Sequence, residues 1–219
     1  MNYRLRLLLT AALAAVLGVL LSSGASRAET IRNHFDTDAM MRPPGFFELT
    51  VLGPNPSPAR WLVLADQNPV SAPNRLAQVE QKRAADSIAA AVRRTYAFED
   101  GSLTAYVRQG GSRAGLLLRM ADEKNFVVLL VDTATGEAVL TSWRDGEPTP
   151  LGRAQAHFAR NWERFGVVAK GAALTVTFND QRLFEATDPR PVSGRTGLVA
   201  AGPGEASFDE FVLEFQPKS

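Results

Sequence analysis

The fold is decided by four segments near the end of the chain: NWERFGVVA (161–169), ALTVTFNDQRLF (173–184), SGRTGLV (193–199) and SFDEFVLEF (207–215). Each segment is short, rich in β-branched and aromatic residues, and bounded by turn residues. In the second segment Leu174, Val176 and Phe178 alternate with threonines, which is the period of a strand with one buried face. Asn179-Asp180 then tolerates the positive φ angles of a tight hairpin.

The same pattern extends over most of the chain. Strand-like segments recur at intervals of about eight to twelve residues, about twelve in all, which indicates an antiparallel β-sandwich. Segments 114–120 and 126–131 are almost continuously apolar, so we expect strands covered on both faces. Segment 151–160 is interpreted as a loop or a one-turn helix. Segment 75–91 stays open: its alanines favour a helix, and its position between strands favours two strands with a turn at 84–87.

The first 28 residues have the composition of a signal peptide. Arg4 and Arg6 precede an apolar run of fifteen residues from Leu7 to Leu21, and small residues lead to a cleavage site after Ala28. The alternative is an uncleaved membrane anchor, but the run is shorter than the roughly twenty residues that span a bilayer. Cleavage would leave no transmembrane anchor, and we expect a periplasmic or secreted bacterial protein.

Residues 29–219 are then expected to form one sandwich domain. The chain carries 24 basic and 23 acidic residues; removing the three arginines of residues 1–28 leaves 21 basic residues and a net charge near −2. This balance favours neither nucleic acid nor an anionic membrane as a partner. Because the chain has no cysteine, it has no disulfide, no thiolate metal site and no lipid-bearing cysteine.

Four motifs resemble the concanavalin A-like (LamG-like) jelly-roll superfamily, and more narrowly the bacterial 3-keto-disaccharide hydrolase-like domains. AGLLLR (114–119) is similar to the family's Gly-apolar-apolar-aromatic-Arg strand, and DEKNFVV (122–128) resembles its Asp-x-x-Asn-Tyr-Tyr hairpin. Segment 162–176 resembles its Trp-x-x-apolar…Gly…Leu-x-Val block. GRTGL (194–198) followed by Phe208-Asp209 resembles its closing Gly-x-x-Gly-Leu…Phe-Asp motif. The resemblance covers roughly Trp61 to Phe215.

The resemblance implies a jelly-roll sandwich and a sugar-related role. The first hypothesis is an exported, lectin-like protein that binds a glycan or another cell-envelope component without catalysis. The second is a glycoside-cleaving enzyme of the 3-keto-disaccharide hydrolase type. The third is an interaction module that binds a protein partner through a sheet edge or an apolar face. Enzymatic activity is therefore left open, because function lives in sites grafted onto such folds.

The candidate ligand-binding residues are Trp143, Arg144, Arg119 and Asp132. A sugar site needs an aromatic ring that stacks on the apolar face of the sugar, beside charged groups that hydrogen-bond its hydroxyls. Trp143-Arg144, at the expected end of a strand, offers both, and Arg119 is expected nearby. The alternative is that Trp143 packs under a loop and the charges are solvated.

Catalytic and metal-binding patterns are sparse. A glycosidase needs two carboxylates at a suitable separation, and the candidates are Asp122, Asp132, Asp188 and Asp209. In Asp209 we expect a carboxylate that accepts backbone hydrogen bonds. His34 and His157 lack partners at metal-ligand spacing. We therefore predict no metal site and no cofactor; calcium on loop oxygens suits this fold, but no Asp-rich loop indicates it.

Overall fold

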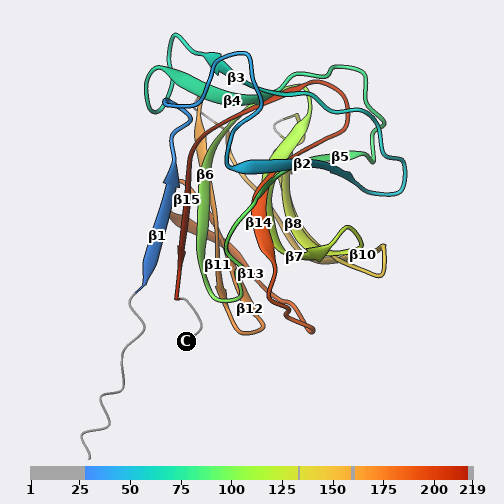
Figure 1. Ribbon diagram of the computed structural model, residues 1–219. Helices are drawn as coiled ribbons and strands as arrows, with labels where there is room; N and C mark the ends of the chain where they lie inside the picture. The colour runs from blue at the N-terminus through green and yellow to red at the C-terminus, as the bar shows by residue number, and fades with distance from the viewer. Residues whose placement is uncertain (1–27, 133, 159–160, 217–219) are drawn as a thin grey trace, which may run out of the picture.

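The structure is a computed structural model that describes residues 28–132, 134–158 and 161–216. Fifteen strands form two antiparallel sheets stacked as a sandwich, and the described residues contain no helix and so no membrane-spanning one (Figure 1). The all-β prediction is confirmed, with fifteen strands in place of about twelve. The predicted signal peptide lies outside the described residues, except for Ala28.

The larger sheet has eight strands. Its order is β13-β12-β11-β6-β15-β4-β3, and β1 pairs with the second half of β15. The strands are β1 (Glu29–Asn33), β3 (Trp61–Ala65), β4 (Asn74–Gln78), β6 (Gly101–Gly110), β11 (Glu163–Lys170), β12 (Ala173–Phe178), β13 (Gln181–Thr187) and β15 (Glu205–Phe215).

The smaller sheet has seven strands in the order β10-β9-β8-β7-β14-β5-β2. The strands are β2 (Phe47–Leu52), β5 (Ile88–Arg93), β7 (Arg113–Asp122), β8 (Asn125–Asp132), β9 (Glu137–Arg144), β10 (Glu147–Gln155) and β14 (Arg195–Ala201). This sheet is strongly curved in Figure 1, and its outer face is the hollow side. Across that face the Thr50 hydroxyl of β2 lies 3.2 Å from the Glu123 carboxylate of the β7–β8 turn.

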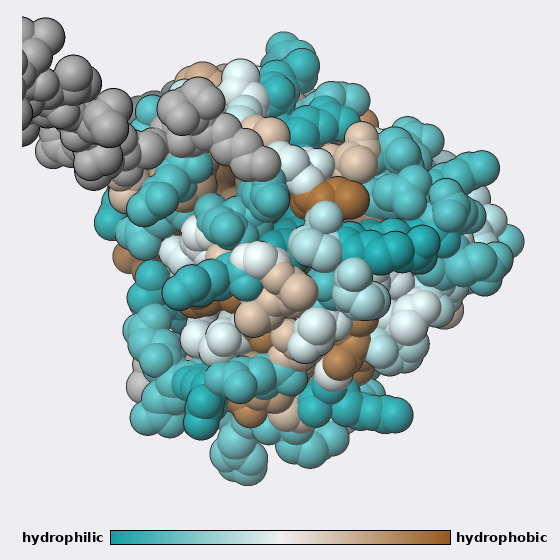
Figure 2. Space-filling model, turned by 90° about the horizontal axis from the view of Figure 1, so that it is seen from below, coloured by the Kyte–Doolittle hydropathy of each residue, from teal (hydrophilic) through white to brown (hydrophobic). Residues whose placement is uncertain are grey.

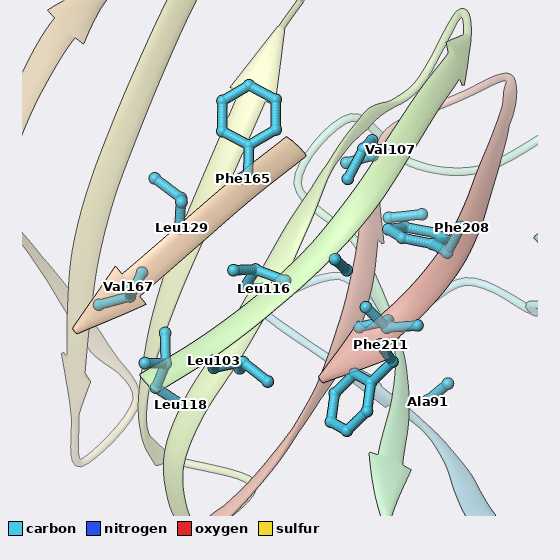
Figure 3. Close-up of a cluster of buried hydrophobic side chains, with 14 of the residues drawn as sticks. Ala91, Leu103, Val107, Leu116, Leu118, Leu129, Phe165, Val167, Phe208 and Phe211 are labelled. Atoms are coloured by element: carbon cyan, nitrogen blue, oxygen red, sulfur yellow. The ribbon is translucent and has the colours of Figure 1, made fainter. Parts of the chain in front are cut away.

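The core lies between the two sheets. Alternate residues of the strands interdigitate there, among them Leu103 of β6, Leu116 of β7 and Phe165 of β11, all with no exposed surface (Figure 3). Leu174 and Val176 face this core, and Asn179 and Asp180 adopt φ angles of 49° and 66° in the hairpin between β12 and β13. Both sequence-based expectations for that hairpin are therefore confirmed.

A second apolar layer covers the outer face of the seven-stranded sheet. Leu117, Phe126 and Val128 lie in this layer, while the residues beside them in sequence point into the main core. Strands β7 and β8 are thus buried on both faces, as their continuous apolarity predicts. The layer matters for function because partly exposed side chains of β8 and β9, Leu130 and Trp143, pack against it.

Two segments resolve questions that the sequence left open or answered wrongly. Segment 75–91 forms parts of β4 and β5 joined by a loop rather than a helix: Ala77 and residues 89–91 are buried in the strands, and Ala84 and Ala85 lie in the loop. The expectation of a loop or one-turn helix at 151–160 is wrong for 151–155, which belong to β10. The strand contains Pro148 and Pro150, which an edge strand tolerates because its outer side needs no N–H donor. The pairing of β10 with β9 shifts its register between Pro150 and Gly152.

Candidate functional site

A groove on the outer face of the seven-stranded sheet is the best candidate for a ligand site. It has a volume of about 200 Å³ and crosses the ends of β7, β8 and β9. Apolar, hydroxyl and charged groups line it together: Arg113, Leu130, Asp132, Thr135, Glu137, Val139 and Thr141. Concave sites with an apolar floor and a few convergent polar groups are typical of small-molecule binding.

Strand register places three charges in one row across the groove. Asp132 of β8 is the direct cross-strand partner of Glu137 of β9. Because Ala114 pairs with Val131, the preceding residue Arg113 of β7 lies opposite Asp132. Directly opposed side chains have Cβ atoms about 4.5–5.5 Å apart. The row therefore presents a guanidinium and two carboxylates within the reach of one ligand.

These three groups hold local partners but keep further hydrogen-bonding capacity. Asp132 Oδ1 accepts a bond of 2.8 Å from the backbone N–H of Ala134. A Glu137 carboxylate oxygen lies 3.5 Å from Arg153 Nη1, and Arg113 Nη2 donates to the Ala85 carbonyl over 2.7 Å. A carboxylate offers about four acceptor sites and a guanidinium five donors. Several of these remain for ligand hydroxyls.

Strand β9 extends the groove into a longer stripe. Glu137, Val139, Thr141 and Trp143 occupy every second position of β9 and so share its outer face. All four are partly exposed, whereas the residues between them are buried. The six residue steps from Glu137 to Trp143 span roughly 20 Å. The stripe therefore has the length to contact several units of an extended ligand, with an aromatic residue at one end and two carboxylates at the other.

Trp143 stands on the apolar layer rather than free in solvent. Its ring stacks on Phe126 of β8, with centroids 5.4 Å apart and an interplanar angle of 18°. Phe126 is fully buried, and Trp143 is partly buried. The stacking fixes the orientation of the indole and leaves part of its surface exposed at the rim.

Arg119 and Arg144 are brought together, but they face a buried carboxylate. Arg119 Nη1 lies 3.3 Å from Asp188 Oδ2, and Arg144 Nη2 lies 2.9 Å from the same oxygen. Arg119 also donates to the carbonyls of Glu99 and Gly171 over 2.8 and 2.6 Å. The Arg119 side chain has no exposed surface and that of Arg144 has 12%. We call Arg119, Arg144 and Asp188 the arginine clamp; it ties the loop after β13 to β7 and β9.

Of the four predicted ligand-binding residues, Trp143 lies on the stripe of β9 and Asp132 lines the groove. The other two, Arg119 and Arg144, belong to the arginine clamp. The structure shows the Trp143 indole packed on Phe126 of the neighbouring strand. Trp143 and Arg144 are neighbours in sequence, and strand alternation sends their side chains to different surroundings.

The remaining carboxylate candidates have structural partners. Asp122 caps the β7–β8 turn, and bonds from the Lys124 N–H and the Asn125 side chain lower its pKa. Asp209 accepts bonds from the N–H groups of Val70 and Ser71, as expected from the closing motif. Burial nevertheless raises the pKa of Asp209. Neither residue lines the groove.

Sequence reasoning missed Arg113, Glu137, Val139 and Thr141. The signal for Glu137 is its place after a short turn between two expected strands, which sets it opposite Asp132. Val139 and Thr141 follow at every second position of the same strand and so share its face. Arg113 could be placed only from the register of β7 against β8. Within residues 28–132, 134–158 and 161–216, no cluster of three or more His, Asp or Glu side chains could hold a metal ion.

A larger hollow of about 440 Å³ lies on the eight-stranded sheet, at the end where β6 begins and β15 ends. Gly101, Val168, Ala169 and Phe215 contribute to its lining. Viewed toward the lower end of the sandwich, the surface is mostly hydrophilic, with small separated hydrophobic areas (Figure 2). We favour the groove because there a row of charges, two hydroxyls and an adjoining aromatic residue converge.

No protein-family model matches the chain, and no curated protein is significantly similar to it. Solved structures are similar in fold. The carbohydrate binding module CBM66 from Bacillus subtilis matches with a TM-score of 0.59 and 14% identity, over 77% of this chain and 97% of that one. Domain 4 of AbnA, a GH43 extracellular arabinanase from Geobacillus stearothermophilus, matches with a TM-score of 0.54 and 14% identity, over 88% and 95%.

A β-glucanase from Bacillus licheniformis is also similar, with a TM-score of 0.55 and 8% identity over 84% of this chain and 97% of that one. At these identities the comparisons establish the fold alone. The chain has a concanavalin A-like, galectin-like β-sandwich fold, which confirms the broader part of the predicted resemblance. Because binding modules and an enzyme share this architecture, function must be argued from the groove.

Proposed function

We propose that the protein is an exported carbohydrate-binding protein, and that its glycan ligand lies along the outer-face stripe from Trp143 to the groove. The observation that carries this proposal is the row of Arg113, Asp132 and Glu137 beside apolar residues of the groove. The stacked Trp143 lies further along β9 on the same face. Sugar hydroxyls both donate and accept hydrogen bonds. A row that combines carboxylate acceptors with guanidinium donors is complementary to them.

The fold comparison supports carbohydrate as the class of ligand. One similar structure is described as a carbohydrate binding module, and another is an arabinanase domain in complex with arabinotriose. The architecture is therefore compatible with sugar binding. The length of the stripe, roughly 20 Å, favours an oligosaccharide over a single sugar unit.

A glycoside-cleaving activity of the 3-keto-disaccharide hydrolase type is the second candidate. One observation favours it: Asp132 and Glu137 are directly opposed, and carboxyl groups about 5–10 Å apart are what glycosidases use. Against it, Asp132 Oδ1 caps its own turn and Glu137 pairs with Arg153. Binding without catalysis therefore remains the first proposal.

Export is part of the proposal. Cleavage after Ala28 would leave Glu29, the first residue of β1, as the new N-terminus. All fifteen strands would then be retained in the mature protein. The N-terminal sequence of protein recovered after expression of the full chain in a bacterial host should begin at Glu29, and a sequence beginning at residue 1 would contradict export.

A glycan array probed with this protein, run beside a hydrolysis assay on oxidised disaccharides, tests both candidates. We expect oligosaccharides on the array to bind and the disaccharides to stay intact. Turnover that disappears in Glu137→Gln would replace the first proposal with the second. Absence of both binding and turnover would refute both sugar-related functions.

A further inference from the structure

The edge strand β2 is unusual among the sheet edges of this protein. It pairs only with β5, and its other side ends the seven-stranded sheet. Its sequence is FELTVL, with no proline and one charge. An unpaired edge presents free N–H and C=O groups on which another strand can form hydrogen bonds.

Hydrogen-bond alternation identifies which groups of β2 point outward. The N–H of Arg94 donates to the Phe46 carbonyl, so positions 46, 48, 50 and 52 bond toward β5. Leu49 and Val51 then direct their N–H and C=O groups away from the sheet. Among the described residues, no backbone group bonds to either residue on that side.

Four other strands, β1, β3, β10 and β13, lie at sheet edges. Strand β1 has only five residues and carries two charges, Glu29 and Arg32. Strand β10 carries Pro148 and Pro150 and a register shift, and its Gly152 lies against the Phe184 ring of β13. The edge strands β10 and β13, one from each sheet, therefore pack against each other. Strand β3 is covered by the preceding segment: Met41 donates to the Val63 carbonyl, and Val63 donates to the Arg42 carbonyl, both over 2.8 Å. These are devices by which proteins block edge pairing; β2 has no proline and no register shift, and it carries a single charge.

Exposed apolar side chains lie at the same edge. Leu49 is 37% exposed, and Phe46, immediately before β2, is 57% exposed. Both belong to the small set of large apolar residues that the described part of the chain leaves in solvent. The edge thus combines free backbone groups with apolar surface that a paired strand would cover.

We propose that β2 pairs with β2 of a second copy of this chain, antiparallel and about a two-fold axis at Leu49. In this register Leu49 faces its own counterpart, and positions 47 and 51 face each other across the interface. The two Leu49 residues exchange N–H···O bonds, and their side chains cover one another. The two seven-stranded sheets join into one continuous sheet.

The register is self-complementary in charge, which argues for a second copy as the occupant. Within the pair of β2 strands no like charges are opposed, because Glu48, the only charged residue of β2, would face Thr50 of the second copy. Glu48 already pairs with Arg195 over 2.6 Å. The groove lies at the β8–β9 end of the sheet, far from β2 in strand order. A dimer would therefore leave both grooves open and could bind a polymeric ligand at two points.

Sedimentation equilibrium of the purified protein tests the proposal, with Leu49→Lys as the variant. We expect a dimer for the natural chain and at least a tenfold weaker one, about 1.4 kcal/mol, for Leu49→Lys, because two lysines would be opposed. The matched control is Val168→Lys, which places the same charge on an apolar residue 45% exposed on β11. This control should remain dimeric.

Because the chain has no cysteine, single cysteines test the register. In a hydrogen-bonded antiparallel pair the Cα atoms lie about 5.5 Å apart, within disulfide range. Leu49→Cys should therefore form a covalent dimer on oxidation, and Glu48→Cys should do so much more slowly. A protein that stays monomeric at all concentrations, a dimer unaffected by Leu49→Lys, or equal crosslinking of both cysteine variants would overturn the proposal.

Discussion

The two ends of strands β7, β8 and β9 carry similar residues in opposite situations. At one end Arg119 and Arg144 enclose Asp188, and side-chain exposure is 0%, 12% and 1% for the three residues. At the other end Arg113 lies beside Asp132 and Glu137 in an open, partly exposed groove. The same combination of residue types, arginine with carboxylate, therefore stabilises the fold where it is buried and remains available to a ligand where it is open.

The largest effect is expected from Asp188→Asn. Two guanidinium groups would lose the charge that neutralises them in a buried environment, and breaking such a cluster costs about 3–5 kcal/mol. Urea unfolding of the variant should show a loss of this size. The control is Asp180→Asn, which removes a carboxylate 68% exposed and 2.6 Å from Arg164; an exposed pair contributes at most about 1 kcal/mol. Equal losses for the two variants would contradict the distinction.

The sequence predicts the fold better than it predicts the surroundings of single charged residues. Alternation in β12 and the double-sided apolarity of β7 and β8 report burial directly, so those strands are predicted correctly. Arg119 interrupts an apolar run in β7, and a lone charge there requires a buried partner. That partner, Asp188, is 69 residues away. No local pattern identifies a contact of that kind, and Arg119 was therefore expected beside a ligand.

The position of β10 illustrates a second limit. Pro148 and Pro150 indicate the end of a strand when the strand is central, but the same residues are compatible with an edge. Whether a strand is central or at an edge depends on the order of strands in the sheet. That order comes from contacts between distant segments, so the local sequence left residues 151–155 as a loop.

An intermediate effect is expected from Trp143→Ala, because the indole packs on the buried Phe126 ring and is also partly exposed to a ligand. Removing the indole exposes the stacked face of Phe126, and the loss of a half-buried aromatic pair should cost about 2 kcal/mol of unfolding free energy. The variant should also bind oligosaccharide more weakly in calorimetry. Trp143→Phe keeps the stacking and should recover most of the stability. If Trp143→Ala leaves stability unchanged, the ring does not rest on the apolar layer as described.

The smallest effect on stability, and the sharpest test of the groove, is expected from the double variant Asp132→Asn with Glu137→Gln. The amide introduced in place of the Asp132 carboxylate would retain an oxygen that accepts the Ala134 N–H, and the pair of Glu137 with the exposed Arg153 contributes little. Unfolding free energy should therefore change by no more than about 0.5 kcal/mol. Binding of the oligosaccharide found on the array should weaken at least about tenfold, because charged acceptors make bonds worth about 1.5–3 kcal/mol each.

Calorimetry on this double variant and on Asp188→Asn separates the two ends of the strands. Folded Asp188→Asn protein should still bind the oligosaccharide, since its groove is intact. The groove variant should instead be as stable as the natural chain and bind poorly, because its substitutions remove charge only where the surface is open. The reverse result, with binding lost in Asp188→Asn and kept in the double variant, would place the ligand at the arginine clamp.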